Sequence, residues 1–483
     1  MLKVIIIGAG GAGLAVLSSM RSRGFDAVIL EKNADIGGVW FNTHYPDLKI
    51  HSKSFNYRFI DFHAIKSETE RATREEVLCY MKDYIAEKKL HQHIYFNTHI
   101  VSVLRKKNKK CEVYARNPIN NEQLKFECDI VICATGLTNS GAPHVPHFDN
   151  EEKFQGMIVH SSQFNQKMLD DVISNQKKVV VLGAGKSSHN ILVLLKKVKE
   201  NITWLYSKSL WSFCFEKVYQ HKNKFSWYHL KFLYTYYLAL LKLRRRFPKY
   251  NGIMRWLQKP LVNTLFVNPL EPNADIFQNR RALMEKEELH YLRTIQSTKS
   301  TIHSLDEHSI TLLNGATLEA DYIICATGYN QIANLPKILI EGNDGVNEEY
   351  DPAARNFMYN ILDLEIPEIA FFMTEVIYLQ QLVSFSIAGE WLANFYQGTL
   401  RKKANSFDHY AALMAKSQSK WHIPNRYLSN GSVYPHEKSN INVLPLMLHD
   451  MAIDKKLAKK LWYSLNKDAF DAVLLKITDK LGK

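Results

Sequence analysis

Two glycine-rich turns, each preceded by a short apolar run, are the residues of this chain most clearly arranged for chemistry. The first turn, residues 8–13, follows the apolar residues 4–7, and the second, residues 183–188, follows residues 179–182. Glycine at the first position of such a turn permits a sharp bend, and glycine at the third lets the backbone approach a pyrophosphate at the N-terminus of the next helix. Each turn therefore predicts a dinucleotide site.

The first turn carries the full glycine pattern, because Gly13 can let the helix pack closely on the strand. Glu31 follows the second predicted strand, residues 27–30, and a carboxylate there accepts hydrogen bonds from the two hydroxyls of an adenosine ribose. The alternative is a glycine-rich surface turn with an unrelated surface glutamate. Strand context and spacing both favour the dinucleotide site.

The second turn departs from this pattern in two places. Ser188 stands where a third glycine is usual, and Ser207 and Lys208 follow the second strand in place of an acid. Without a carboxylate for the ribose 2′-hydroxyl, and with a cation and a hydroxyl available, NADP(H) is favoured over NAD(H). A merely solvated Lys208 is the alternative interpretation.

Each turn is matched later in the chain by an apolar strand that ends in Ala-Thr-Gly, at residues 129–136 and 321–328. Cys133 and Cys325 occupy the same place in the two strands, which indicates a packing role. A protein that holds two dinucleotides side by side most simply passes a hydride from one to the other.

The composition limits the alternatives. The chain has 483 residues, 46% hydrophobic and 23% charged, as expected for a globular protein of two or three domains. Its six cysteines form no C-x-x-C and no His/Cys cluster, so we expect neither a bound metal nor a disulfide-reductase centre. A reduced, cytoplasmic compartment fits this cysteine usage.

Neither of two apolar stretches of the chain suggests insertion into a membrane. Residues 1–17 are apolar, but their glycines indicate a nucleotide-binding start instead of a secretion signal. The apolar run 232–241 is too short to span a bilayer. The net charge of +14 is spread along the chain, which favours a solvated basic surface over nucleic-acid binding.

The order of motifs predicts an α/β protein with two Rossmann-like dinucleotide-binding domains, the second inserted in the first. We expect residues 1–165 to begin the first domain, 166–326 to form the second domain, 327–400 to return to the first domain and 401–483 to form a helical extension. Helices are expected at 14–23, 74–90 and 190–198, and short strands at 94–128 and 300–326.

An insert at about 212–285 has no nucleotide-binding character and is rich in aromatic and basic residues. Its segment 226–247 suits an apolar substrate entrance or a helix at a membrane surface. An amphipathic helix packed on the domain is an equal alternative.

Residues 154–164 follow the pattern F-x-G-x-x-x-H-x-x-x-F and lie between the two glycine-rich turns. Alone, His160 would be a hydrogen-bonded structural histidine. The pattern resembles the identifying sequence of the flavin-containing monooxygenases, or class B flavoprotein monooxygenases. The resemblance covers about residues 1–210 and 285–400, and further similar segments are 31–40, 45–48, 321–329 and 367–371.

Three positions depart from that family. The Baeyer–Villiger branch carries Trp where this chain has Phe164, which disfavours that branch. Many members place Asn beside the flavin at the position where this chain has His51. The plant auxin-forming branch is similar to this chain in having His there, and neutral His can also donate a hydrogen bond. Ser207 replaces the usual Arg for the 2′-phosphate, with Lys208 beside it.

The resemblance implies FAD and NADP(H) as cofactors, so that an NADP domain is inserted in an FAD domain, with dioxygen and a small organic molecule as substrates. NADPH would reduce FAD, and a C4a-(hydro)peroxyflavin would oxygenate a nucleophilic nitrogen or sulfur, or a carbonyl. His51 is the candidate catalytic residue. The candidate cofactor-binding residues are Gly8, Gly10, Gly11, Ala12, Gly13, Glu31, Lys32, Gly38, Val39, Trp40, Val101, Ala134, Thr135, Gly136, Gly183, Gly185, Lys186, Ser187, Ser188, Ser207, Lys208, Thr327 and Gly328.

Two other functions fit the same motifs. An NADPH-dependent flavin reductase or oxidase would use both cofactor sites without oxygen transfer, and only the segment around His160 speaks against it. A non-catalytic flavoprotein acting through the aromatic insert as a membrane or partner module ranks below it, because both turns look intact. Nothing in the sequence specifies the substrate or the oligomeric state.

Overall fold

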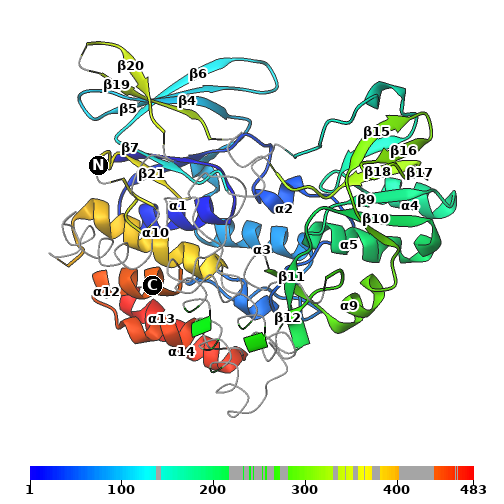
Figure 1. The fold of residues 1–483 in the computed structure, drawn as a ribbon. Coiled ribbons are helices and arrows are strands. Elements are labelled where there is room, and N and C mark those ends of the chain that lie inside the picture. Colours follow the sequence, from blue (N-terminus) through cyan, green and yellow to red (C-terminus); the bar gives the residue numbers. More distant parts are fainter. Residues whose placement is uncertain are drawn as a thin grey trace. The chain divides into compact units, whose positions relative to one another are not determined.

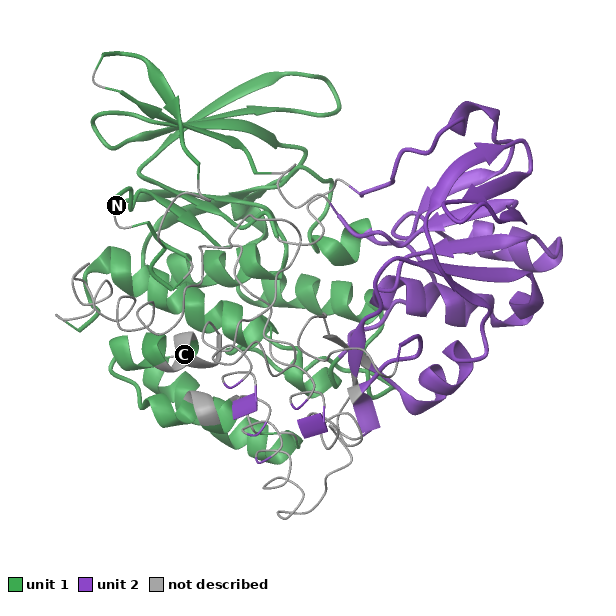
Figure 2. Cartoon of the chain, viewed as in Figure 1, with its two compact units in different colours: residues 1–42, 52–142, 330–483 green, residues 43–51, 143–329 purple. Residues whose placement is uncertain are grey.

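The chain divides into two compact units (Figures 1 and 2). Unit 1 comprises residues 1–42, 52–142 and 330–483, and unit 2 comprises residues 43–51 and 143–329. This computed structural model describes residues 1–136, 143–216, 266–271, 281–329, 335–351 without 343, 357–372 without 360 and 364, 381–401, 440–482 without 463 and 465, and separate positions between 232 and 257. The sequence-based domain boundaries stay predictions.

A parallel sheet forms the centre of unit 1. Within the described residues its strand order is β21-β7-β1-β2-β3, and all neighbouring pairs are parallel. The strands are β1 (Lys3–Ile7), β2 (Asp26–Leu30), β3 (Ile94–Tyr95), β7 (Ile130–Cys133) and β21 (Ile369–Phe371). Strands β1 and β7 are buried over almost their whole length, which explains why their sequences are continuously apolar.

Helix α1 (Gly11–Ser22) packs along α10 (Gln381–Gln397) in unit 1. Gly389 allows this approach, because a Cβ there would lie 3.3 Å from the Ala15 carbonyl oxygen. The other helices of the unit are α2 (Val39–Asn42), α3 (Arg74–Glu87), α12 (Asn440–Asp450), α13 (Lys455–Trp462), α14 (Lys467–Leu481) and the 3₁₀ turns η1 (Ser54–Asn56) and η2 (His91–His93).

A second sheet of unit 1 has the order β20-β19-β4-β5-β6 in the described part of the chain. Its strands are β4 (His99–Arg105), β5 (Cys111–Arg116), β6 (Gln123–Cys128), β19 (Lys337–Glu341) and β20 (Asn347–Glu349). Alternate residues of β5, among them Cys111 and Val113, are buried in one core with residues of β1 and β7. This sheet therefore packs one face on the parallel sheet.

Unit 2 contains a second parallel sheet, ordered β14-β10-β9-β18-β8 within the described residues. Its strands are β8 (Met157–His160), β9 (Val179–Leu182), β10 (Ile202–Tyr206), β14 (Ser297–Lys299) and β18 (Tyr322–Cys325). The unit's helices are α4 (Gln166–Ser174), α5 (Lys186–Leu194), α9 (Lys286–Leu292) and the 3₁₀ segments η3 (Glu151–Lys153) and η4 (Leu195–Asn201).

Two small sheets complete the described part of unit 2. One has the order β15-β16-β17, formed by β15 (Ile302–Asp306), β16 (Ser309–Leu312) and β17 (Thr317–Glu319). The other has the order β12-β11-β13, formed by β11 (Trp211–Cys214), β12 (Phe266–Val267) and β13 (Arg281–Met284). Strands β11 and β13 bracket the predicted insert and pair in parallel.

The doubled sequence signature corresponds to a doubled structure. Strand β9 has the neighbours β10 and β18, just as β1 has the neighbours β2 and β7. Gly8 N donates to Leu30 O at 2.9 Å, and Gly183 N donates to Leu205 O at 2.9 Å. The predicted α/β fold with two dinucleotide-binding sheets is confirmed.

For two helices, the start predicted from the sequence lies too late in the chain. Helix α1 begins at Gly11, not at 14, and α5 begins at Lys186, not at 190, because Gly10 and Gly185 are themselves the N-cap residues. The second helix also ends at Leu194, where the chain continues as the 3₁₀ segment η4. Glycine lowers helix propensity, which hides a helix that starts inside a glycine-rich turn.

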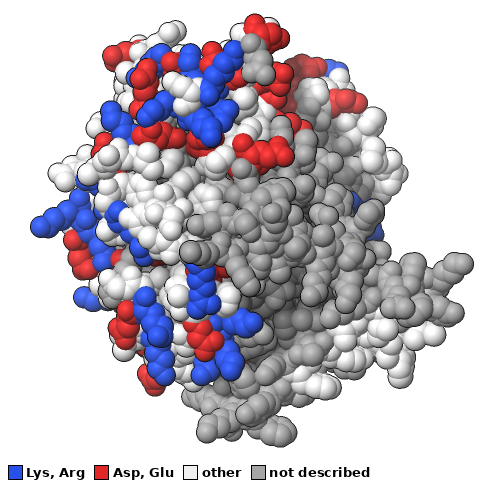
Figure 3. Space-filling model, turned by 90° about the vertical axis from the view of Figure 1, so that its left-hand side faces the viewer, with Lys and Arg blue, Asp and Glu red and all other residues white. Residues whose placement is uncertain are grey.

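Most of the insert 212–285, including most of the segment 226–247, lies outside the described residues, so its proposed membrane contact is not addressed by the fold. Among the residues that are described, no helix is both long and apolar enough to cross a bilayer. On the face in Figure 3, acidic side chains lie among the basic ones. Ion pairs of unit 1 such as Lys125–Glu112 and Lys337–Glu349 also join opposite charges at its surface.

Gly13 supports a prediction about stability. A Cβ on Gly13 would lie 1.9 Å from the carbonyl oxygen of Gly8, so α1 would have to move away from β1. We expect Gly13→Ala to lower the free energy of unfolding by about 3 kcal/mol. Urea unfolding of apoprotein measures this, with Gly185→Ala as the control, because its Cβ would meet nothing within 4 Å. Equal stability of the two variants would contradict the packing role.

Candidate functional site

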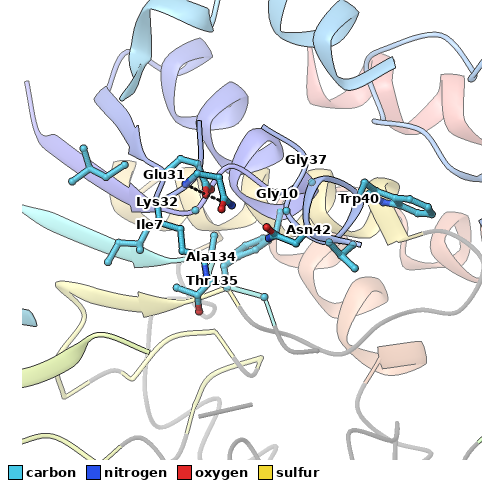
Figure 4. A pocket seen from close by; sticks show the side chains of 18 of the residues that line it. Ile7, Gly10, Glu31, Lys32, Gly37, Trp40, Asn42, Ala134 and Thr135 are labelled. Atoms are coloured by element: carbon cyan, nitrogen blue, oxygen red, sulfur yellow. Dashed lines mark hydrogen bonds between the residues drawn. The ribbon is translucent and has the colours of Figure 1, made fainter. Parts of the chain in front are cut away.

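An elongated pocket in unit 1 lies along the C-terminal edge of the parallel sheet (Figure 4). Glu31 and Lys32 line one end, Trp40 lies at the other, and Gly10 lies between them. Residues at the ends of β1 and β2, just after β7 and in the first turn of α1 line the pocket. This edge of an open α/β sheet is where ligands bind in such folds.

Close backbone contacts shape the middle of the pocket. Gly8 has a φ of 105°, and a Cβ there would lie 2.8 Å from Ala134 O. A Cβ on Gly38 would lie 3.1 Å from the Gly10 Cα, so two backbone segments meet without side chains between them. The N-terminus of α1 opens on this bare surface, which fits a pyrophosphate held by backbone N–H groups.

Glu31 is buried at one end of the pocket and is held by three donors. Its Oε2 accepts from Ala9 N at 2.6 Å, and its Oε1 accepts from Asn33 N at 2.9 Å and Asn33 Nδ2 at 2.7 Å. Burial raises the pKa of Glu31, and these hydrogen bonds act in the opposite direction. A carboxylate has about four acceptor positions, so Oε2 keeps one for a ribose hydroxyl.

The opposite end of the pocket is aromatic. Trp40 Nε1 donates to Tyr57 Oη at 2.8 Å, and the two rings meet edge to face with centroids 5.9 Å apart. Arg74 holds this segment in place, because its Nε donates to Trp40 O at 2.7 Å and its Nη2 to Phe41 O at 3.3 Å. Phe372, Gln381 and Phe385 also line the pocket, and Phe385 comes from α10.

Twelve of the predicted residues of the first site line this pocket: Gly8, Gly10, Gly11, Ala12, Glu31, Lys32, Gly38, Val39, Trp40, Ala134, Thr135 and Gly136. Gly13 lies behind it, against Gly8. Val101 does not line it: its side chain is half exposed on β4, where its neighbour Ile100 faces the pocket because successive strand residues alternate.

Sequence reasoning missed several lining residues, notably Asn33, Asn42, Tyr57, Thr98 and Phe385. Asn33 had a local signal, because an Asn two residues after the strand-ending glutamate can bond back to it. Asn42 lies two residues after Trp40 in α2, next to a segment that was predicted. Tyr57, Thr98 and Phe385 reach the pocket from separate segments, and no spacing in the sequence marks them.

Unit 2 repeats the turn with one side chain added. A Cβ on Gly183 would lie 2.4 Å from Ala326 O, which parallels the contact of Gly8 with Ala134. Trp204 Nε1 donates to Gly183 O at 2.6 Å, and Ser188 Oγ donates to Gly185 O at 2.6 Å. Ser188 thus takes up the position of the missing third glycine while its hydroxyl remains bonded within the turn.

Lys186, the first residue of α5, forms an ion pair with Glu288 of α9. Its Nζ lies 2.6 Å and 2.7 Å from the two carboxylate oxygens, and the side chains are only 11% and 9% exposed. His189 is buried one turn later, and its burial together with nearby Lys186 lowers its pKa to about 3. His189 therefore stays neutral. The charge in the first turn of α5 is that of Lys186, which Glu288 balances.

Ser207 and Lys208 are exposed just beyond the end of β10, as the NADP(H) interpretation requires. A second lysine ends the neighbouring strand, because Lys299 is in register with Tyr206. Lys299 Nζ donates to Glu271 Oε1 at 2.6 Å, so an acid and two lysines lie near this edge of the unit 2 sheet.

His160 is fully buried and joins two strand ends of unit 2. Its Nδ1 lies 2.8 Å from Ser162 Oγ and its Nε2 lies 2.9 Å from Gly328 O. Burial lowers the pKa of His160. The Thr327 hydroxyl donates to His144 O, so the second Ala-Thr-Gly turn is fixed from both sides.

His51 is exposed at the end of the segment 43–51, which belongs to unit 2, and it does not line the unit 1 pocket. Tyr45 of the same segment is buried, and its hydroxyl accepts from Asn190 Nδ2 of α5 at 2.9 Å. The segment is therefore anchored on α5, while the role of His51 stays a prediction.

Two parallel sheets in which four strands follow the same order, each with a glycine-rich turn at the same edge, define the class of proteins with paired dinucleotide-binding folds. Within that class, the family described as flavin-binding monooxygenase-like (FMO-like) matches residues 1–336. The chain belongs to this family. The expected flavin cofactor and oxidoreductase activity are thereby confirmed.

Curated relatives agree with this family. The chain is 24% identical over 344 residues to the probable FAD-binding monooxygenase AlmA of an Acinetobacter species, covering 67% of this chain and 68% of that protein. It is 26% identical over 329 residues to the probable indole-3-pyruvate monooxygenase YUCCA10 of Arabidopsis thaliana, covering 68% of this chain and 81% of that protein.

Solved structures share the fold. A steroid monooxygenase bound to NADP superposes with a TM-score of 0.67 and 16% identity, covering 95% of this chain and 97% of that chain. A polycyclic ketone monooxygenase from the fungus Thermothelomyces thermophila gives a TM-score of 0.66 with 13% identity, covering 93% and 87%.

The Lys186–Glu288 pair supports a prediction about stability. We expect Glu288→Leu to lower the free energy of unfolding by about 3 kcal/mol, because Lys186 then stays in a buried site without its carboxylate partner. The double variant Lys186→Met/Glu288→Leu should recover most of this loss. Urea unfolding followed by tryptophan fluorescence measures both variants.

The exposed pair Lys299–Glu271 is the matched control for this experiment. Lys299→Ala should change the free energy of unfolding by less than about 1 kcal/mol, because water screens that pair. A double variant at Lys186 and Glu288 that is no more stable than Glu288→Leu would contradict the explanation.

Proposed function

We propose that this chain is an FAD- and NADPH-dependent monooxygenase that transfers one oxygen atom to a nucleophilic nitrogen or sulfur, or to a carbonyl, of a small organic substrate. The observation that carries the proposal is the duplicated turn-and-sheet arrangement, with a pocket along the sheet edge of unit 1 and an exposed lysine at a strand end of unit 2. Membership of the flavin-binding monooxygenase-like family supports it.

The residues of the unit 1 pocket fit FAD. Glu31 would accept an adenosine ribose hydroxyl, and the bare backbone at Gly10 and Gly38 would hold the pyrophosphate at the N-terminus of α1. The isoalloxazine would then lie toward Trp40, because that end of the pocket is opposite Glu31.

The turn of unit 2 fits NADP(H). Gly185 leaves open space above the N-terminus of α5, where Ser187 and Ser188 follow Lys186 in the first turn. Ser207 and Lys208 would bind the 2′-phosphate, because both are exposed at the end of β10. The steroid monooxygenase that shares this fold was solved with NADP bound.

When bound, the reduced flavin would take up dioxygen as a C4a-(hydro)peroxide, and that adduct would supply the transferred oxygen atom. The protein's own residues bind and orient both cofactors and exclude water. We propose His51 as a hydrogen-bond donor beside the flavin edge, since neutral imidazole carries one N–H. One curated relative is named for indole-3-pyruvate, which supports including 2-oxo acids among the candidate substrates.

Stopped-flow absorbance tests this function. FAD-loaded protein is reduced anaerobically with NADPH, mixed with oxygen, and followed with thioethers, tertiary amines, ketones and 2-oxo acids in turn. A long-lived species before oxidised flavin returns, with oxygenated product, supports the monooxygenase. Release of hydrogen peroxide equal to NADPH consumed with every compound supports the reductase or oxidase instead.

Two glycine variants should separate the two cofactor sites. Gly10→Ala places a methyl group 3.7 Å from Gly38 Cα, and Gly185→Ala places one in open space, so both variants fold. We expect Gly10→Ala to weaken FAD binding at least about tenfold and Gly185→Ala to weaken NADPH binding similarly, because each methyl group occupies pyrophosphate space. Calorimetric titration of each cofactor measures both. Loss of the opposite cofactor would contradict the assignment.

Lys208 should determine selectivity for NADPH. We expect Lys208→Ala to raise the KM for NADPH about 5- to 30-fold and to leave the KM for NADH unchanged, because one charge-assisted hydrogen bond to the 2′-phosphate is lost. Initial rates of flavin reduction measure both. Lys197→Ala, at another exposed lysine of unit 2, is the control and should change neither value. Equal effects on NADPH and NADH would exclude the role of Lys208.

A further inference from the structure

Tyr57 occupies the aromatic end of the unit 1 pocket and has no counterpart among the residues that the sequence motifs single out. Its side chain is buried, and its hydroxyl oxygen lies 2.8 Å from Trp40 Nε1. Tyr57 follows the turn η1, so it reaches the pocket from a different segment than Trp40 does.

The direction of this hydrogen bond follows from chemistry. An indole N–H can only donate, so Tyr57 Oη is the acceptor and keeps its own proton for a second bond. The edge-to-face contact of the two rings fixes the phenol beside the indole. Trp40 therefore orients the hydroxyl group without using its proton.

Among the described residues, no protein group accepts the Tyr57 hydroxyl proton. A buried donor without a partner is unfavourable, so its acceptor is expected to be a ligand that fills the pocket. An isoalloxazine ring at the Trp40 end of the pocket would offer carbonyl oxygens and ring nitrogens as acceptors, and Tyr57 lies beside Trp40.

We propose that Tyr57 donates a hydrogen bond to the isoalloxazine of FAD, with Trp40 as the positioning residue that directs it. This inference rests on the proposed function, because it requires FAD in the unit 1 pocket. Arg74 supports the arrangement from behind, through its bonds to the carbonyl oxygens of Trp40 and Phe41.

A donor at this place acts on the electron density of the flavin. Reduction adds negative charge to the ring carbonyls and nitrogens, so a hydrogen bond from Tyr57 stabilises reduced flavin more than oxidised flavin. Burial raises the pKa of Tyr57, with the bond from Trp40 acting in the opposite direction. The hydroxyl group therefore stays protonated, and stays a donor, at physiological pH.

Tyr57→Phe tests the inference, because it removes the hydroxyl group and keeps the ring. Apoprotein is titrated with FAD by fluorescence, and the flavin midpoint potential is measured by dye equilibration. We expect FAD to bind about 3- to 10-fold more weakly and the potential to become more negative. Neither readout requires a substrate or turnover.

Tyr80→Phe is the matched control. Tyr80 is another buried tyrosine of unit 1 whose hydroxyl accepts one bond, from Phe59 N at 2.9 Å, but it does not line the pocket. Its removal should leave both FAD affinity and potential unchanged. A shift in Tyr80→Phe equal to that in Tyr57→Phe would overturn the inference, since general loosening of the unit would explain both.

Trp40→Phe tests the positioning step. If Trp40 acts through Tyr57, the effect of Tyr57→Phe on the potential should be much smaller in the Trp40→Phe background than in wild type. Unchanged FAD affinity and potential in Tyr57→Phe would overturn this inference alone. Failure of the wild type to bind FAD would overturn the proposed function and this inference together.

Discussion

The contact between a glycine and a carbonyl oxygen at the strand edge is the constraint on which both cofactor sites depend. Gly8 lies against Ala134 O and Gly183 against Ala326 O, so in each unit the turn after the first strand touches the turn after a neighbouring strand. Any side chain at these glycines would separate the two turns. Because the turns stay in contact, the N-terminus of the following helix opens directly on the sheet edge, where a pyrophosphate can reach its N–H groups.

The two units use the same frame with different chemistry. In unit 1 the strand end carries Glu31, whose carboxylate is already oriented by Ala9 and Asn33, and the pocket continues to an aromatic end. In unit 2 the corresponding strand end carries Ser207 and Lys208, and the helix start carries Lys186 paired with Glu288. Unit 1 thus carries an acid, and unit 2 a cation, at equivalent strand ends. This is the difference expected between a site for an unmodified ribose and a site for a ribose 2′-phosphate.

The sequence was informative where the constraint on a residue comes from its own segment of the chain. The glycine turns, Glu31 and the paired Ala-Thr-Gly strands could be placed because their constraint is local, whereas Tyr57 and Phe385 could not, since long-range packing brings them to the pocket. Val101 illustrates a second limit. Its strand was predicted, but successive residues of a strand point to opposite faces, and Val101 is on the face away from the pocket. Helix starts were misplaced because glycine turns resemble loops in composition.

The stem of the insert has a consequence for how this protein can change. Strands β11 and β13 pair in parallel, Glu216 accepts from Lys286 N at 3.0 Å, and Glu288 joins α9 to the first residue of α5. These bonds close the insert at its base, and Glu271 also joins it to the unit 2 sheet, because Lys299 at the end of β14 donates to its carboxylate. A chimera that exchanges the segment between β11 and β13 would therefore have to keep Glu216 and Glu271, so that the sheet edge beside Ser207 and Lys208 is unchanged.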